Sequence, residues 1–379
     1  MKQLVLITFC SLLFTSAGWA QKPERVHGWA VVQNSMKWYE QQVQLWNKEL
    51  DKNPNNAMGW YNCYYAMRIL NRFNPEDKRT PEEKVAQMDS FFKRMEKSIP
   101  RTYEYNLAKW ANAGFDLTQK GYYDNVVKLG KDRTEHADYM INFGEIDRDM
   151  KARDEGCKLK VENGSVSNGF LNYNYNVLIG LKNNAILFTC GDNDTYPAWI
   201  LQAQGIRRDV TVINLSLILV DEYRNRLLKE LGMPKLDSID FSKPDQVNST
   251  LVNYFIQNSK RPVYIGVTVN VHEFKSIEND LFLTGMAYEY NTTTIDDMAA
   301  LRKNFEQLYA LDYIDKSFAP DISGDLVKVV NQNYLIPMIK LYDHYKAVGD
   351  LQRTLWIKQK ALIIAKNSPQ EKEVITHFQ

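Results

Sequence analysis

The sequence predicts an α/β fold combined with all-α segments, in which a small Rossmann-like parallel sheet is flanked by tetratricopeptide-like helical repeats. Three observations lead to this prediction. Apolar residues recur at helical spacing in both the N-terminal and the C-terminal part of the chain. Three β-branched runs between them alternate with amphipathic segments, as in parallel α/β domains. The chain has 379 residues, 44% of them apolar, which is enough for two or three domains with packed cores.

The first twenty residues are predicted to be a secretory signal peptide. Lys2 supplies the positive start, residues 4–14 form an apolar stretch, and Gly18 and Ala20 are the small residues that a cleavage site requires. The stretch is too short for an ordinary membrane span, and no other long apolar run follows. We therefore expect cleavage after Ala20 and an exported protein, periplasmic or secreted, with no membrane span in the mature chain.

Residues 21–154 are expected to be helical and tetratricopeptide-like. The run "NPNNAMGWYNCYYAMRIL" resembles the opening of such a repeat, with Trp60 and Tyr61 in its first helix. In "TPEEKVAQMDSFFKRMEKSIP", Thr80 and Glu83 form a capping box around Pro81, which predicts a second helix. The aromatic residues at helical spacing are expected to pack between helices, with a concave groove for a peptide or partner helix as the alternative.

Residues 296–379 are expected to be helical and to end in one tetratricopeptide-like unit. In "NYLIPMIKLYDHYKAVGDLQRTLWIKQKALIIAKNSP", two helical segments flank a turn at Gly349 and Asp350. Thr354 stands where the repeat usually has Ala, and Pro369 comes about three residues late. These departures predict a terminal or degenerate repeat.

Residues 155–295 are expected to form the α/β domain. The runs "AILFT" and "VTVINLSLIL" are apolar nearly throughout, as expected of strands covered on both faces. The third run, "RPVYIGVTVNV", alternates and is expected to lie near an edge of the sheet or to line a cleft. The segments "YPAWILQAQ" and "DEYRNRLLKELGM" between the strands predict helices, so the strands should run parallel; "GMAYEY" would add a further strand.

Charge and cysteine usage exclude some classes of function. Removal of residues 1–20 would leave 46 Lys and Arg against 46 Asp and Glu, without a basic stripe, which argues against nucleic acid and anionic membranes as partners. Cys63, Cys157 and Cys190 lack metal-ligand spacing. Buried thiols are the favoured interpretation; one disulfide with an unassigned pairing is the alternative.

Polar residues follow each of the three predicted strands. Because ligands of open parallel sheets bind beyond the carboxyl ends of the strands, these residues are the candidate ligand-binding set. The candidates are Asp192, Asn193, Asp194 and Thr195 after the first strand, Asn214 and Asp221 after the second, and His272 after the third; Ser216, Asn270 and Glu273 also fall at these strand ends.

The run "GDNDTYP" has two interpretations. Asp194 or Thr195 can cap a helix starting near Tyr196, with Pro197 in its first turn, and this capping interpretation is favoured. Alternatively, Asp192 and Asp194 hold a hard cation, Mg²⁺ or Mn²⁺, through carboxylate oxygens. His272 is expected to be a surface or hydrogen-bonding residue rather than a general base. No catalytic residues are assigned, because the sequence shows no Ser/His/Asp set, no Gly-rich phosphate loop and no metal-binding His pair.

The middle of the chain resembles a known family. The run "NAILFTCGDNDTYPAWILQAQGIRRDVTVINLSLILVDEYRNRLL", with the later "RPVYIGVTVN" and "LTGMAYEY", is similar to the soluble C-terminal region of a bacterial family of multi-pass membrane proteins related to protein O-mannosyltransferases. The resemblance covers roughly residues 170–380. It implies an exported, stand-alone relative of an accessory domain of these glycosyl-transfer proteins, and it assigns no role to Asp192 or Asp194.

Three functions follow as hypotheses. The favoured one is an exported scaffold or binding protein, whose repeats hold an envelope protein partner and whose α/β domain binds a glycan or another small ligand. The second is a divalent-cation-dependent enzyme acting on a sugar or phosphate ester at the GDND strand end. The third is a structural protein of a larger envelope complex, with the α/β domain as a spacer.

Overall fold

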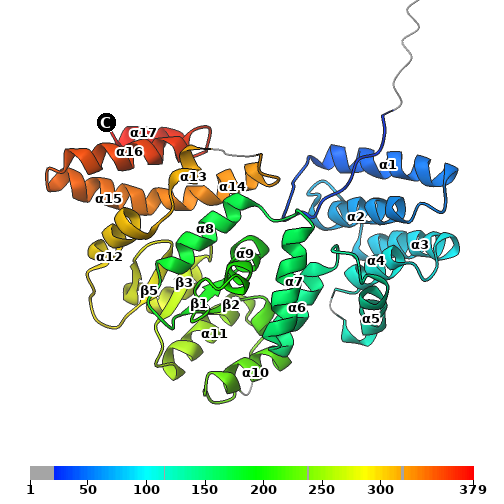
Figure 1. The fold of residues 1–379 in the computed structure, drawn as a ribbon, viewed down its shortest axis with the longest axis horizontal. Helices are drawn as coiled ribbons and strands as arrows, with labels where there is room; N and C mark the ends of the chain where they lie inside the picture. The colour runs from blue at the N-terminus through cyan, green and yellow to red at the C-terminus, as the bar shows by residue number, and fades with distance from the viewer. Residues whose placement is uncertain (1–20, 115, 237–238, 317–319) are drawn as a thin grey trace, which may run out of the picture. The chain divides into compact units, whose positions relative to one another are not determined.

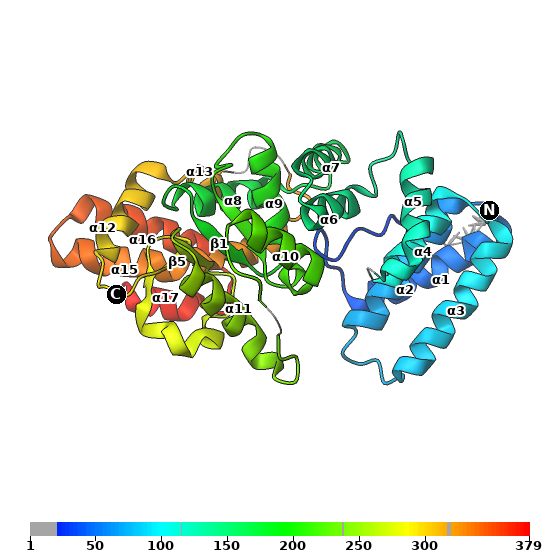
Figure 2. The ribbon, with the colours of Figure 1, turned by 90° about the horizontal axis from the view of Figure 1, so that it is seen from below.

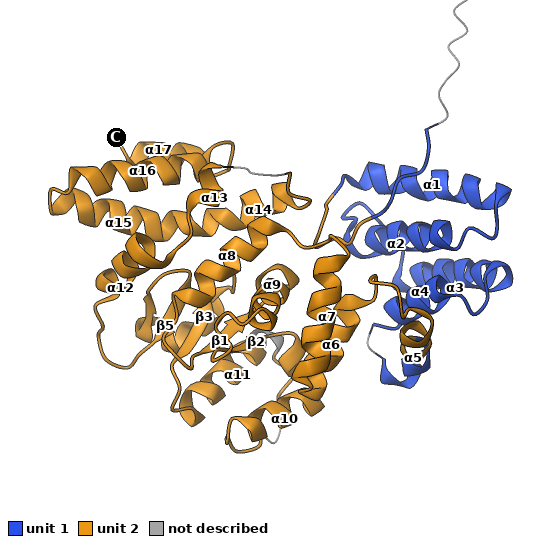
Figure 3. Ribbon diagram, in the orientation of Figure 1, with its two compact units in different colours: residues 1–26, 34–122 blue, residues 27–33, 123–379 orange. Residues whose placement is uncertain are grey.

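The computed structural model describes residues 21–114, 116–236, 239–316 and 320–379 (Figure 1). The predicted signal peptide and its cleavage site lie outside these residues. The chain divides into two compact units, the first containing residues 34–122 with the preceding 21–26, the second residues 27–33 and 123–379 (Figure 3). Within the described ranges, no helix has the length and hydrophobicity that a membrane crossing requires.

The first unit is built from helices. They are α1 (Met36–Lys52), α2 (Ala57–Phe73), α3 (Pro81–Ser98) and α4 (Tyr103–Ala113), and α5 (Lys120–Leu129) crosses the boundary to the second unit. The predicted capping box of Thr80 and Glu83 is confirmed at the start of α3. Trp60 and Tyr64 are buried on α2 and contact Phe91 and Phe92 of α3. These two aromatic residues therefore pack between helices.

The second unit holds a five-stranded sheet in the order β2-β1-β3-β5-β4. The strands are β1 (Ile186–Thr189), β2 (Thr211–Asn214), β3 (Val263–Gly266), β4 (Leu281–Leu283) and β5 (Ala287–Tyr290). The parallel pairing of the three predicted strands is confirmed, since β1 pairs in parallel with both β2 and β3. The prediction of a wholly parallel sheet is wrong, because β4 and β5 form a hairpin whose strand β5 pairs antiparallel with β3.

Strand β3 differs from its prediction. It is short, buried along its whole length and flanked by β1 and β5, so it lies inside the sheet rather than at an edge. The alternating pattern continues beyond Gly266 although the chain has left the sheet there. Val267 and Thr268, which follow the strand, line a cavity described below.

The two faces of the sheet are covered by different helices. Leu187, Val212 and Tyr264 belong to one core, shared with α8 (Asn168–Ile179) and α9 (Asp192–Ala203). Ile186, Ile213 and Ile265, which are their neighbours in sequence, belong to a second core, shared with α10 (Asp221–Glu230) and α11 (Pro244–Asn258). This alternation is the period-two pattern of a sheet buried on both faces.

Further helices complete the second unit. They are α6 (Ala137–Asp147), α7 (Met150–Glu162), α12 (Asp297–Lys303), α13 (Asp312–Asp315), α14 (Gly324–Asn331), α15 (Leu335–Ala347), α16 (Leu351–Ala365) and α17 (Glu371–His377). Helices α15, α16 and α17 lie side by side (Figures 1 and 2). The predicted turn between α15 and α16 is confirmed: Gly349 has a φ of 77°, and Asp350 caps α16.

Candidate functional site

The carboxylate of Asp194 ties together the ends of β1 and β3. It accepts hydrogen bonds from the backbone N–H groups of Cys190 at 3.0 Å and Gly191 at 2.7 Å, and from the hydroxyl of Thr268. The side chain is buried, and burial raises the pKa of Asp194 while these hydrogen bonds lower it. Asp194 therefore closes the strand-to-helix turn from inside.

A second cluster joins the ends of β1 and β2. The hydroxyl of Thr195 lies 2.7 Å from that of Thr189 and accepts a hydrogen bond from Asn214 Nδ2 at 3.0 Å. The Oδ1 atom of Asn214 accepts the backbone N–H groups of Ser216 and Leu217. Residues from two strand ends thus meet, as the parallel pairing predicts, but they form hydrogen bonds with one another instead of facing a ligand. We call Thr189, Thr195 and Asn214 the hydroxyl cluster.

Helix α9 begins earlier than predicted. Its first residue is Asp192 after an N-cap at Gly191, so Pro197 lies inside the helix and neither Asp194 nor Thr195 is the N-cap. Pro197 has no N–H to give to the carbonyl of Asn193, four residues earlier. Instead, the Asn174 side chain of α8 donates to that carbonyl at 2.9 Å. A side chain from another helix therefore allows the proline to remain inside α9.

The other candidates do not converge with Asp194. Asp192 and His272 are exposed, and Asp221 is exposed at the start of α10, where it forms an ion pair with Arg224. Both oxygens of Asp194 already accept protein N–H groups, which leaves the predicted cation site without support from its geometry. Within the described part of the chain, no group of three or more His, Cys, Asp or Glu residues could hold a metal ion.

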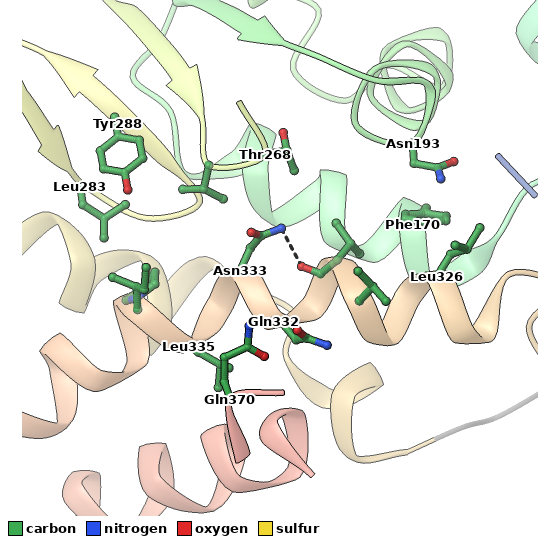
Figure 4. Close-up of a pocket in the computed structure, with 15 residues that line it drawn as sticks. Phe170, Asn193, Thr268, Leu283, Tyr288, Leu326, Gln332, Asn333, Leu335 and Gln370 are labelled. Atoms are coloured by element: carbon green, nitrogen blue, oxygen red, sulfur yellow. Dashed lines mark hydrogen bonds between the residues drawn. The ribbon is translucent and has the colours of Figure 1, made fainter. Parts of the chain in front are cut away.

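A cavity of about 590 Å³ opens beside these strand ends (Figure 4). Its walls come from the start of α9, the segment after β3, the β4–β5 hairpin, the first turns of α8 and the region from α14 to α15. Among the described residues that line it, six are polar, namely Asn193, Thr268, Tyr288, Gln332, Asn333 and Gln370, and the other nine are apolar. None of them carries a charge. A cavity of this size is within the range of small-molecule sites.

Most of the polar groups in this cavity are not used by the protein. In the described structure, the side chains of Asn193, Gln332 and Gln370 and the hydroxyl of Tyr288 form no hydrogen bond with another residue. Thr268 bonds to Asp194, and Asn333 donates to the carbonyl of Val330 at 2.9 Å (Figure 4). Burial raises the pKa of Tyr288, so its hydroxyl is neutral at physiological pH.

Only one of the predicted site residues, Asn193, lines the cavity. Thr268 was visible as a polar position in the alternating third run, directly beyond the strand. The sequence contained no signal for Gln332, Asn333 and Gln370, because they come from the helical C-terminal region that was expected to serve as a repeat.

The three cysteines of the described chain are free thiols. Cys63 and Cys157 are buried, and burial raises the pKa of each to about 12. Cys190 is exposed beside Asp194.

Comparison with known protein families identifies a model that matches part of the chain. The family model described as TMEM260-associated domain 2 matches residues 171–235, from α8 to just beyond α10. This match agrees with the resemblance to a family related to protein O-mannosyltransferases, although it covers a minority of the chain. Searches of curated proteins and of solved structures found no match.

Proposed function

We propose that this chain is an exported binding protein whose α/β domain takes an uncharged, hydroxyl-rich ligand, such as a glycan, in the cavity beside the carboxyl ends of β1 and β3. The observation that carries the proposal is the lining: amides and hydroxyls with unused hydrogen-bonding capacity lie among apolar residues, without a single charge. Sugars offer the matching chemistry, because they combine neutral hydroxyl groups with apolar ring faces that pack against side chains such as Phe170.

The same lining favours binding over catalysis. General acid–base catalysis is most effective with a titratable group whose pKa lies near the working pH, and the titratable side chain of the described lining is Tyr288, whose pKa is raised by burial. The similarity of residues 171–235 to TMEM260-associated domain 2 supports a role alongside glycosyl transfer, as an accessory domain rather than as the transferase. We further propose that the α/β domain is Rossmann-like and is related to the soluble C-terminal region of a bacterial membrane protein family.

The helical parts of the chain are proposed to hold an envelope protein partner, in the manner of tetratricopeptide repeats. Support comes from α16, on which Leu351 and Leu355 stand one turn apart and are 75% and 59% exposed. If this surface binds a partner, the pair Leu351→Ser and Leu355→Ser should abolish co-purification from envelope extracts. The neighbouring exposed change Gln352→Ser is the matched control and should leave co-purification unchanged.

Calorimetric titration of the purified chain with a panel of neutral saccharides tests ligand binding. Tyr288→Phe removes one unused hydroxyl from the cavity and should weaken binding about two- to tenfold, the range of one neutral hydrogen bond. Tyr290→Phe is the matched control, because Tyr290 lies on the same strand and does not line the cavity. Equal affinities of the two variants would remove this cavity as the binding site.

A further inference from the structure

The cavity contains oxygen atoms whose hydrogen-bonding role is set by the protein around them. Asn333 Nδ2 donates to the backbone carbonyl of Val330, which can only accept (Figure 4). The amide must therefore keep its nitrogen toward Val330 and its Oδ1 atom away from it. At this position the side chain of Asn333 offers a ligand an acceptor.

Thr268 also offers a hydrogen-bond acceptor to a ligand. Each oxygen of Asp194 accepts a hydrogen bond from a backbone N–H group, so both oxygens act as acceptors. The Thr268 hydroxyl therefore donates its single proton to this carboxylate. The lone pairs of the Thr268 oxygen are what remain for a ligand. Asp194 is thus a positioning residue: it touches no ligand itself and sets the role of Thr268, which lines the cavity.

A buried amide behind the wall carries one further acceptor atom. Asn174 is fully buried, and its Nδ2 donates to the carbonyls of Phe170 and Asn193, both cavity-lining residues. Its Oδ1 atom has no hydrogen-bond partner. Buried polar atoms without a partner are rare in folded proteins, and a buried water would satisfy this one.

We propose that the part of the cavity formed by Thr268 and Asn333 selects for hydrogen-bond donors: hydroxyl or N–H groups of the ligand are bound there by the acceptor oxygens of these two side chains. This inference rests on the proposed function and sharpens it. A ligand that places ether or ester oxygens beside Thr268 and Asn333, in place of hydroxyls, would set acceptors against acceptors at that point. Such a ligand should bind more weakly, because the oxygens of Thr268 and Asn333 would lose water without gaining a donor.

The test compares probes that carry hydroxyl donors with O-methylated partners that lack them, at pH 7.5 and by calorimetry or NMR titration of the whole chain. One pair is methyl hexopyranosides (gluco, manno and galacto) against the same sugars with every hydroxyl O-methylated. The second pair is phenol against anisole, which works whether or not the ligand is a sugar. We expect each donor probe to bind at least about tenfold more tightly than its methylated partner, as for one to two hydrogen bonds.

The variants show whether Thr268 acts as described. Thr268→Val keeps the shape and removes the oxygen, so it should weaken binding of the donor probe about tenfold and leave the methylated probe unaffected. Thr268→Ser should retain the discrimination. A purely structural role of Thr268 would change both affinities together and leave their ratio unchanged.

The outcomes separate the two proposals. If no saccharide binds but phenol binds in the cavity tenfold more tightly than anisole, the glycan proposal fails and the donor rule stands. If a methylated probe binds as tightly as its parent, or if neither phenol nor any sugar perturbs the cavity residues, the donor rule is overturned. A selectivity ratio that Thr268→Val leaves unchanged overturns the role assigned to Thr268 and Asp194.

Discussion

Substitution of Gly169 by Ala should loosen the helix that forms one wall of the cavity. Gly169 lies in the first turn of α8, and a Cβ atom built there would stand 2.5 Å and 2.6 Å from the two methyl carbons of Val327 on α14. Ordinary contacts between such carbons are about 3.5–4.0 Å. Helix α14 would have to move by about 1 Å, and α14 supplies Leu326, Val329 and Val330 to the cavity.

The magnitude follows from two opposing effects. Overpacking of this kind costs about 1–3 kcal/mol, and Ala in place of Gly in a helix returns up to about 1 kcal/mol, so we expect a net loss of about 1–2 kcal/mol. Val327→Ala alone should cost about 1.5–3 kcal/mol, because it removes two buried methyl groups. The double variant Gly169→Ala, Val327→Ala should be more stable than the sum of the single effects by about 1 kcal/mol or more, since the new methyl occupies the vacated space.

Urea unfolding followed by circular dichroism measures these values, with Gly121→Ala as the control. Gly121 lies on a helix, and its Cβ would meet nothing within 4 Å, so this change should be neutral or slightly stabilising. Strict additivity of the two changes at positions 169 and 327 would refute the close contact between α8 and α14.

Three further predictions concern the sheet and the thiols. Thr195→Val should destabilise the chain by about 1–3 kcal/mol, because it removes two short buried hydrogen bonds and leaves Thr189 Oγ1 and Asn214 Nδ2 with only long contacts of 3.4 Å and 3.5 Å to backbone carbonyls; an unchanged urea midpoint would contradict this. The Arg207 guanidinium lowers the pKa of Asp209 to about 2. The contribution of this ion pair to stability is therefore present above about pH 4 and is lost as the pH falls toward 2. The difference in urea midpoint between wild type and Asp209→Asn should shrink over that window and stay constant above it. In the folded chain lacking residues 1–20, a thiol reagent at pH 7.5 should modify Cys190 alone, and Cys63 and Cys157 should react only after denaturation; rapid modification of all three would show that the burial is wrong.

Features that depend on neighbouring residues were predictable from the sequence. The capping box of Thr80 and Glu83 and the turn at Gly349 and Asp350 are formed by side chains and backbone within a few positions of one another. The parallel pairing of β1, β2 and β3 also follows from the order of strands and helices, because short right-handed crossovers leave few alternatives.

The start of α9 and the antiparallel hairpin were not predictable in this way. From the neighbouring residues alone, Pro197 indicates the start of a helix. It lies inside α9 because the side chain of Asn174, on another helix, donates to the carbonyl that the proline leaves unpaired. Strand β5 was expected as an addition to a parallel sheet, and its direction is set by the hairpin with β4.

The chain order of residues was sufficient to place polar groups at the tips of three strands, since period-two and helical patterns are local properties of a chain. Which of these groups remain available to a ligand was decided by the folded structure. Asp194 and Thr195 turn inward because donors from separate segments reach them, whereas Asn193 and Thr268 remain in the cavity wall. The other polar residues of the cavity come from the β4–β5 hairpin and the C-terminal helices; they are Tyr288, Gln332, Asn333 and Gln370. The packing of these elements depends on contacts between residues far apart in the sequence.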